Sequence, residues 1–194
     1  MVDKIKKAIC TGCKMCGDIC PTGAIGFSTE YDGCWYPTVD TKKCINCGLC
    51  ERQCPALNYI ESINFDDPNV YAAWTKDDKI RFDSTSGGIY YELASYFINS
   101  GGYIVGCVFS DDYKSAKHVV GRTYKDLQAI MGSKYFQSDT AGIYKRVLEL
   151  LKRNERVLFC GTPCQVAALR AYLGREYENL YLLDFICKGI NSPK

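Results

Sequence analysis

Eight cysteines near the start of the chain have types and spacing suited to metal-cluster chemistry. They form two runs of the pattern Cys-x2-Cys-x2-Cys-x3-Cys-Pro, namely Cys10, Cys13, Cys16, Cys20 and Cys44, Cys47, Cys50, Cys54. In such a run, three thiols two residues apart wrap one 4Fe-4S cluster, and the fourth lies beyond the loop and reaches the other cluster. The spacing therefore predicts two clusters and, with them, one-electron transfer.

The crossing of the fourth ligands assigns four cysteines to each cluster. Cluster one is expected to take the first three cysteines of the first run and the last of the second: Cys10, Cys13, Cys16 and Cys54. Cluster two is expected to take the complementary set: Cys44, Cys47, Cys50 and Cys20. Pro21 and Pro55 turn the chain away after each run, because proline has a fixed φ and no N–H.

Two other uses of cysteine fit this pattern less well. Structural zinc takes four ligands, usually as two Cys-x2-Cys pairs, whereas each run here has four cysteines and ends in Cys-Pro. A disulfide framework requires an oxidising compartment, and residues 1–7 lack the apolar segment of a signal peptide. Thirteen cysteines without such a segment indicate a reducing, cytoplasmic location.

Length and charge narrow the remaining possibilities. The chain has 194 residues, enough for one or two domains, and a formal net charge of +2. Acidic and basic residues are mixed along it, so it presents neither a basic face for nucleic acid nor a polybasic membrane anchor. No stretch approaches the ~18 apolar residues of a membrane span. We therefore expect no nucleic-acid partner and no membrane span.

The pattern along the chain divides it into three segments. Residues 1–58 contain the two-fold repeat of an α+β ferredoxin-like module, with a hairpin predicted at residues 26–39 around Asp32-Gly33. The hairpin's aromatic side chains are expected to cover a cluster, and Cys34 to be an ordinary thiol. Residues 59–69 predict a linker. Residues 70–194 alternate strands and helices, which predicts an α/β domain with a mostly parallel sheet.

The α/β segment is expected to carry its ligand-binding loops at strand ends. Strands are predicted at residues 70–74, 103–109, 116–122, 156–160 and 180–186. Helices are predicted at residues 89–99, 124–131, 140–153 and 163–173, the third of them strongly amphipathic. Sheets of this kind bind ligands outside the carboxyl ends of their strands.

Two loops of this segment could hold a phosphate group. Ser86-Gly87-Gly88 precedes a predicted helix, where free N–H groups bind anions and glycines allow close approach. A capped helix start with turn glycines explains the same residues. Gly132-Ser133-Lys134-Tyr135 lies between two predicted helices, and its lysine could also hold a phosphate. The alternative for that loop is a solvated turn.

Two later cysteines are candidates for a further metal site. Cys164 follows a strand and opens a helix, where the positive end of the helix dipole favours a thiolate. Cys187 would emerge at the same sheet edge if the two strands are parallel neighbours. The alternative for Cys164 is a small core residue. Cys107 and Cys160 are expected to face a core, and His118, the only histidine, to be structural.

Taken in order, these motifs resemble the coenzyme F-420 (F420) hydrogenase/dehydrogenase beta-subunit family, in its form with an N-terminal two-cluster ferredoxin domain. Beside the cysteine runs, the resemblance rests on Ser86-Gly87-Gly88, Gly132-Ser133-Lys134-Tyr135, Gly161-Thr162-Pro163-Cys164-Gln165, and Cys187-Lys188-Gly189 with Ser192-Pro193. It implies a flavoprotein, with FAD or FMN, that passes electrons between iron–sulfur clusters and a two-electron carrier such as F420. The flavin or coenzyme pocket would include Ser86, Gly87, Gly88, Gly132, Ser133, Lys134, Tyr135 and Thr162; no catalytic residue is assigned.

The resemblance also implies where this chain departs from its relatives. In the family, positions matching Cys164 and Cys187 help to bind a third cluster, together with a Cys-x2-Cys further downstream. This sequence has no later Cys-x2-Cys and carries Lys188 where the family usually has histidine. We therefore expect the chain to be truncated at its carboxyl end relative to the family, with an incomplete α/β domain.

The leading hypothesis for function is a flavin-dependent iron–sulfur oxidoreductase. It would exchange electrons with a small-molecule carrier and with a redox partner protein or subunit, and the flavin would connect two-electron to one-electron chemistry. One rival is a non-catalytic, ferredoxin-type electron-transfer module or subunit. Another is a structural or sensing protein that carries clusters. Flavin content separates the first hypothesis from the second.

Overall fold

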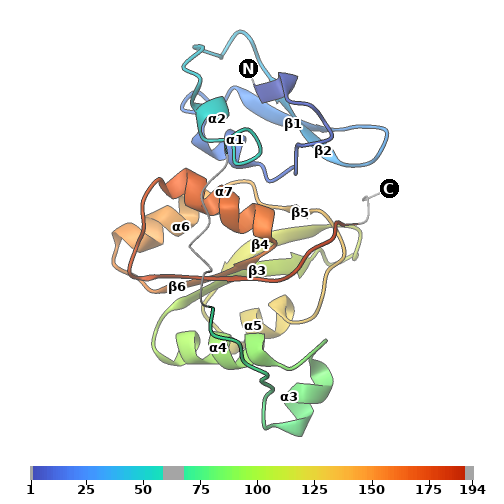
Figure 1. The fold of residues 1–194 in the computed structure, drawn as a ribbon, viewed down its shortest axis with the longest axis vertical. Helices are drawn as coiled ribbons and strands as arrows, with labels where there is room; N and C mark the ends of the chain where they lie inside the picture. The colour runs from blue at the N-terminus through green and yellow to red at the C-terminus, as the bar shows by residue number, and fades with distance from the viewer. Residues whose placement is uncertain (1, 59–67, 191–194) are drawn as a thin grey trace.

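The computed structural model describes residues 2–58 and 68–190, and these form two parts stacked along the long axis (Figure 1). The smaller part holds both cysteine runs and is called here the cysteine module. The larger part contains a five-stranded sheet with helices and is called the sheet domain. The two-part organisation follows the sequence prediction. Most of the predicted linker, residues 59–67, lies outside the described residues.

The two cysteine runs fold with the same backbone geometry. Two residues after the first cysteine of each run, Gly12 and Asn46 have φ values of 63° and 53°. One residue after the second cysteine, Lys14 and Gly48 have φ values of 58° and 71°. Short helices then begin at equivalent residues, α1 (Met15–Ile19) and α2 (Leu49–Arg52). The repeat in the sequence is therefore a repeat of structure.

A hairpin separates the two runs, as the sequence predicts. It consists of β1 (Ile25–Thr29) and β2 (Trp35–Val39), which pair antiparallel with Ile25 opposite Val39. Gly33 has a φ of 79°, so the connecting turn needs a residue that tolerates the left-handed region. The 3-10 helix η1 (Val2–Lys4) packs against β2 and completes the module.

The sheet domain has the strand order β5-β4-β3-β6-β7. Its strands are β3 (Tyr103–Phe109), β4 (Ala116–Gly121), β5 (Ser138–Asp139), β6 (Val157–Gly161) and β7 (Leu180–Asp184). β6 pairs parallel with β3 and β7, and β5 pairs parallel with β4. The β3–β4 pair is antiparallel. A mostly parallel sheet is therefore confirmed.

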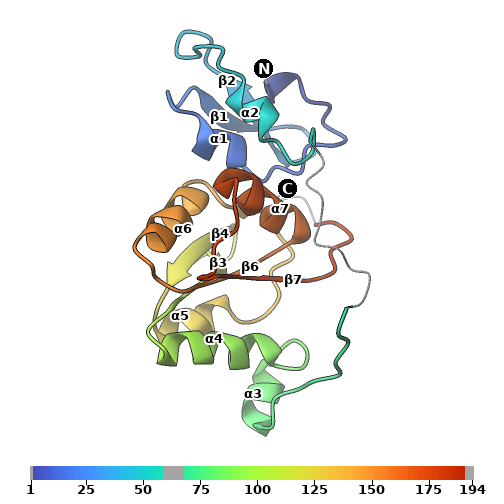
Figure 2. The ribbon, with the colours of Figure 1, turned by 60° about the vertical axis from the view of Figure 1, so that its left-hand side comes forward.

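Helices cover both faces of this sheet (Figure 2). They are α4 (Ile89–Asn99) and α5 (Tyr124–Ile130) on one face, α6 (Ile143–Lys152) and α7 (Pro163–Leu173) on the other, with α3 (Asp78–Asp83) beyond α4. Alternation along β3 explains the two layers. Val105 packs with Phe159 in the core under α6 and α7, whereas Ile104 packs with Leu158 in the core under α4 and α5.

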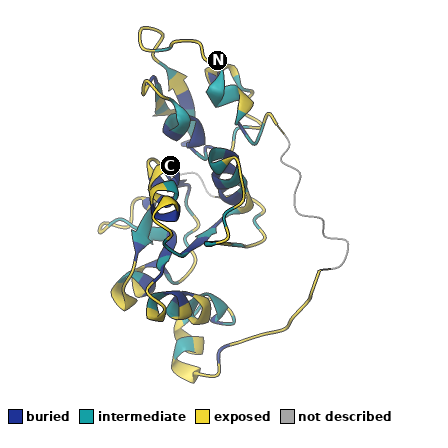
Figure 3. Ribbon diagram, turned by 90° about the vertical axis from the view of Figure 1, so that its left-hand side faces the viewer, coloured by how far each residue is buried: buried dark blue, intermediate teal, exposed yellow. Residues whose placement is uncertain are grey.

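The core under α6 and α7 continues into the cysteine module. Met15 of α1 is 1% exposed and belongs to this core, and Cys13 and Ile19 pack against it. Buried positions run from the sheet through α7 to the adjoining loops of the module (Figure 3). The module is therefore held against the sheet domain by apolar packing, in addition to the chain connection.

One predicted strand is wrong. Residues 68–75 have no regular structure, and Val70, Tyr71 and Trp74 are 87%, 81% and 64% exposed. An apolar run becomes a strand only where a neighbouring strand accepts its hydrogen bonds, and here Thr75 N donates to Gly87 O in a loop. The helix predicted at residues 140–153 begins only at Ile143, after Gly142 with a φ of 79°.

Candidate metal-cluster site

Four cysteines from both runs line one pocket of the cysteine module: Cys10, Cys13, Cys16 and Cys54. Apolar side chains, among them Met15 and Phe27, complete its walls. Burial raises the pKa of Cys13 to about 11, with a smaller contribution from the neighbouring Cys54 thiolate, and burial likewise raises the pKa of Cys16. The pocket therefore disfavours bare thiolates and suits thiolates whose charge is balanced by metal.

The remaining cysteines of the two runs lie nearer the surface. Cys47 is exposed, and Cys20, Cys44 and Cys50 are partly buried. Desolvation alone would raise the pKa of Cys20, but hydrogen bonds from Thr22 and from backbone N–H groups, including Ala24 N at 3.3 Å from Sγ, lower it. Hydrogen bonds to sulfur are one means by which proteins set cluster potentials.

The two sets of cysteines adjoin each other. The Cys50 thiolate of the second set contributes to the raised pKa of Cys16, behind burial and the thiolates of Cys13, Cys10 and Cys54. Within the described residues, no group of three or more His, Cys, Asp or Glu side chains converges as ligands of a single ion would. A cubane cluster instead distributes its four thiolates over four iron atoms.

One segment of the sheet domain holds the loop of the first cysteine run. Thr140 Oγ1 and Tyr144 OH donate hydrogen bonds to the Cys13 carbonyl oxygen, at 2.7 and 2.8 Å, and both side chains are fully buried. Nearby, Trp35 N donates to Gln137 Oε1 at 2.9 Å. We call residues 137–144 the docking segment. It fixes the position of Cys13 by direct hydrogen bonds from two residues, Thr140 and Tyr144, that lie far from Cys13 in the sequence.

The docking segment in turn receives a helix cap from the cysteine module. Asp18 of α1 accepts hydrogen bonds from Gly142 N at 2.7 Å and Tyr144 N at 3.1 Å, at the start of α6. Gly142 offers no side-chain cap of its own. Burial raises the pKa of Asp18, although these N–H groups act in the opposite direction. Asp18 thus satisfies donors that the first turn of a helix leaves unpaired.

Cys164 lies close to the loop of the first run. It occupies the first turn of α7, with its thiol 3.0 Å from Thr162 Oγ1. Its thiolate is near enough to contribute to the raised pKa of Cys13, after burial as the main cause. The start of α7 therefore lies near the pocket that Cys13 lines.

Cys187 emerges at the same sheet edge, as predicted. β6 and β7 are parallel neighbours with Gly161 opposite Asp184, so Cys164 and Cys187 each lie three residues beyond a paired strand end. The Cys187 thiol donates to Gly189 O at 3.6 Å. A third metal site at this pair stays a prediction.

A buried polar network fixes the start of α7. Thr162 forms a capping box with Gln165, and Gln165 Nε2 donates to Ser138 Oγ at 2.8 Å. Ser138 Oγ lies 3.0 Å from His118 Nδ1, and His118 Nε2 lies 3.2 Å from Cys160 O. Burial lowers the pKa of His118 to about 4, so the ring is neutral. Ser138 was not singled out from the sequence. Gln165 was named there only as part of a motif, although Thr-x-x-Gln is a capping-box signature.

Two segments expected to bind a coenzyme lie side by side. Ser133 N donates to Thr85 Oγ1 at 3.2 Å, which joins the loop before α4 to the loop after α5. Gly88 adopts a φ of 76° at the N-cap of α4, and a Cβ at Gly87 would lie 2.8 Å from Ala73 O. Backbone packing therefore accounts for both glycines, as in the alternative interpretation of the motif.

The lysine of the second loop has a structural role. Lys134 Nζ lies 2.5 to 3.1 Å from the carbonyl oxygens of residues 129–132, at the carboxyl end of α5. Burial lowers its pKa. The ammonium group thus caps α5 by satisfying carbonyls that the helix leaves unpaired. Tyr135 beside it is 66% exposed.

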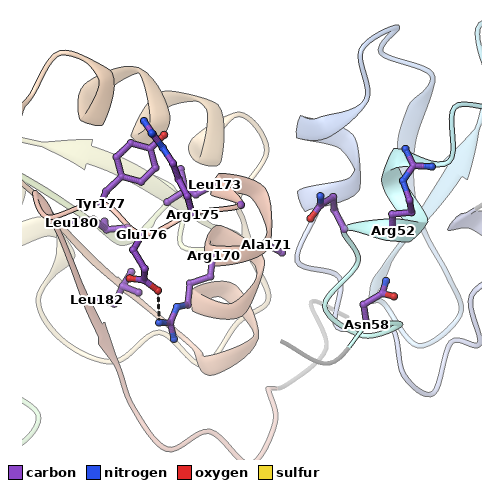
Figure 4. Close-up of a pocket in the computed structure, with 12 residues that line it drawn as sticks. Arg52, Asn58, Arg170, Ala171, Leu173, Arg175, Glu176, Tyr177, Leu180 and Leu182 are labelled. Carbon is purple, nitrogen blue, oxygen red and sulfur yellow. Dashed lines mark hydrogen bonds and ion pairs between the residues drawn. The ribbon is translucent and has the colours of Figure 1, made fainter. Parts of the chain in front are cut away.

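A larger cavity, of about 340 Å³, lies between α2 of the module and the end of α7 (Figure 4). Arg52, Arg170 and Arg175 line it, and Glu176 pairs with Arg170 at 2.9 Å. Arg52 also donates to Cys47 O at 2.9 Å, so the cavity adjoins the loop of the second run. Within the described residues, none of the predicted coenzyme-binding positions lines it.

Two family models match separate segments of the chain. Residues 9–58 match the 4Fe-4S dicluster domain, and residues 70–145 match the N-terminal domain of the coenzyme F420 hydrogenase/dehydrogenase beta subunit. The chain therefore carries one segment that matches a 4Fe-4S dicluster domain, followed by another that matches the N-terminal domain of this beta-subunit family. The resemblance drawn from the motifs is confirmed.

Individual proteins resemble parts of the chain. An uncharacterized ferredoxin of Methanocaldococcus jannaschii is 36% identical over 55 residues, which are 28% of this chain and 66% of that ferredoxin. A chain of the F420-reducing NiFe hydrogenase complex from Methanosarcina barkeri superposes with a TM-score of 0.49 at 22% identity, over 59% of this chain and 42% of that one. The matched segments thus span only part of either relative. Among the described residues, no helix has the length and hydrophobicity needed to cross a membrane.

Proposed function

We propose that this chain is an iron–sulfur electron-transfer protein with cluster one on Cys10, Cys13, Cys16 and Cys54, and cluster two on Cys20, Cys44, Cys47 and Cys50. The observation that carries the assignment is that Cys54, from the second run, lines the same pocket as the first three cysteines of the first run. The dicluster motif requires this crossing. When bound, the clusters supply one-electron chemistry, and a flavin or F420-type carrier supplies two-electron chemistry.

The chain's own residues give the two sets of ligands different surroundings. The docking segment and Cys164 lie against the Cys13 loop, and the apolar walls around Met15 and Phe27 keep water from the first set. The second set includes the exposed Cys47 and adjoins the arginine-lined cavity. This difference supports cluster one as the end that communicates with the sheet domain and cluster two as the end that meets an external redox partner.

We further propose that the sheet domain serves a two-electron carrier, with FAD, FMN or F420 as candidates. Support comes from the beta-subunit family match over residues 70–145 and from the contact between the loops that contain Ser86 to Gly88 and Gly132 to Tyr135. The same proposal includes Thr162 among the residues that bind the carrier, and a third metal site at Cys164 and Cys187. The ammonium of Lys134 would not contribute to carrier binding, because it is engaged with α5 carbonyls.

Anaerobic purification followed by iron, sulfide and flavin analysis tests both proposals. About eight irons and eight sulfides per chain are expected if both clusters bind. Released FAD or FMN would support the oxidoreductase. A full iron complement without flavin would favour the second candidate, a non-catalytic electron-transfer subunit, which the dicluster match alone supports. Four irons or fewer per chain, under conditions that protect clusters from oxygen, would overturn the assignment of two clusters.

A further inference from the structure

Lys14 occupies an unusual backbone position between two ligands of cluster one. It follows Cys13 directly and has a φ of 58°, in the left-handed region. The equivalent residue of the second run is Gly48, with a φ of 71°. Glycine adopts this region without steric cost, whereas a lysine there is strained. The repeat therefore shows that a side chain is retained at residue 14 although the backbone geometry favours glycine.

The Lys14 side chain is buried and its charge is paired. The residue is 6% exposed, and Nζ lies 2.9 Å from Asp139 Oδ2 of the docking segment. The same ammonium lies 3.7 Å from the centre of the Trp35 ring and 5.4 Å from that of Phe27. A buried ammonium is costly unless it is paired. These contacts hold the charge in place where a surface lysine would be mobile.

The position of the charge relates it to cluster one. Lys14 lines the same pocket as the four cysteines of that cluster, together with Phe27. Asp139 does not line the pocket, and its side chain is 42% exposed, so water screens the carboxylate more than the ammonium. Asp18 of α1 is also buried, but its carboxylate accepts hydrogen bonds from the N–H groups of Gly142 and Tyr144.

The second run offers no equivalent. Gly48 has no side chain, and two described cations near this loop are both exposed: Arg52, which donates to Cys47 O, and Lys43, which precedes Cys44. Charges in solvent are largely screened, whereas a buried charge acts through a medium of lower dielectric. The two clusters therefore differ in the fixed positive charge beside them.

We propose that Lys14 is a positioning residue that raises the reduction potential of cluster one. Burial by itself lowers that potential, because a reduced cluster carries one more negative charge into an apolar pocket. The fixed ammonium counteracts this effect by stabilising the reduced form, since net charge and solvent exposure set cluster potentials. In the reduction of cluster one, a single electron passes from an external donor to the cluster, and no bond forms or breaks. The proposal rests on the cluster assignment made above.

An EPR-monitored redox titration with dithionite tests the proposal on the anaerobically purified full chain. In Lys14→Met the reduction potential of cluster one should fall by at least about 59 mV. For a one-electron couple, this shift lowers the ratio of reduced to oxidised cluster tenfold at a fixed solution potential. Cluster two should be unchanged. Lys14→Arg keeps the charge and should restore the wild-type potential. A Cys47→Ser background, which retains only cluster one, identifies which signal moves.

Two further variants keep the test decisive. Lys43 also neighbours a cluster ligand, Cys44, but its side chain is 63% exposed, so Lys43→Met should leave both potentials in place. Asp139→Asn removes the negative partner and should shift cluster one in the opposite direction, even if Lys14→Met fails to assemble it. An unchanged cluster-one potential in Lys14→Met, or in Asp139→Asn if the former does not assemble, would overturn the inference. Loss of both clusters from the wild-type protein would instead overturn the proposed function.

Discussion

The hydrogen bonds that the docking segment makes to the Cys13 carbonyl should hold the two parts of the protein together cooperatively. Thr140→Val and Tyr144→Phe remove one donor each while preserving side-chain shape. A buried hydrogen bond of this kind contributes about 1 kcal/mol, or about a fivefold change in an opening equilibrium. Burial raises the pKa of Tyr144, so its phenol stays protonated and available as a donor.

Removing both donors should cost more than the sum of the two single changes. The single variants leave the Cys13 carbonyl with one donor, whereas the double variant leaves it with neither Thr140 nor Tyr144. An unsatisfied buried acceptor adds about 1–3 kcal/mol. We therefore expect a total of about 3–5 kcal/mol, more than about a hundredfold in opening, and a coupling energy of about 1–3 kcal/mol.

Native-state hydrogen exchange under anaerobic conditions is the appropriate assay, because it needs no reversible unfolding of a cluster protein. The amides of Gly142 and Tyr144 donate to Asp18 across the contact, so a peptide spanning residues 140–147 reports its opening. A peptide from α4, on the far face of the sheet, serves as the internal control. Additive or negligible effects at residues 140–147, or an equal acceleration in α4, would show that these two hydrogen bonds do not hold the contact cooperatively.

Three further predictions follow from single positions. Because burial lowers the pKa of His118 to about 4, the folded state binds fewer protons than the unfolded state between about pH 6.5 and 4, so stability falls on acidification. From pH 7.5 to 5.5 the loss should be about 1 kcal/mol in thermal melts, and His118→Phe should abolish this part of the slope. Gly106→Ala would place a Cβ 2.4 Å from Ile130 Cγ2 and should destabilise the protein by about 1–3 kcal/mol, whereas Gly26→Ala, with its nearest atom at 3.3 Å, should not; equal melting temperatures would contradict this. Cys54→Ser should remove cluster one although it alters the second run, and loss of cluster two alone, seen by EPR, would show that the ligands do not cross.

Local signals in the sequence predict much of the sheet domain. The limits of α4 and α7 match those predicted, because Gly101-Gly102 follows one helix and Pro163 opens the other. The start of α6 is misplaced since Gly142 takes the left-handed region and receives its cap from Asp18, 124 residues away. No local pattern contains that information. The strand predicted at residues 70–74 fails for a similar reason, since its apolar residues find no neighbouring strand.

For the candidate site, the sequence predicts the ligands but not their surroundings. The spacing of the cysteines is enough to expect that Cys54 joins the first run, because the fourth ligand must lie beyond the cluster loop. The pairing of Lys14 with Asp139 and the two hydroxyl groups at Cys13 depend on how the module docks, which joins residues more than a hundred positions apart. The cavity between α2 and α7 likewise exists only because the two parts meet.

Native mass spectrometry of the anaerobically purified chain counts the bound clusters directly. We expect a dominant species whose mass exceeds that of the polypeptide by two 4Fe-4S clusters, and a variant lacking Cys54 that retains one. A polypeptide that carries zinc ions, or a single cluster in the wild-type protein under conditions that protect clusters from oxygen, would contradict the assignment of two clusters.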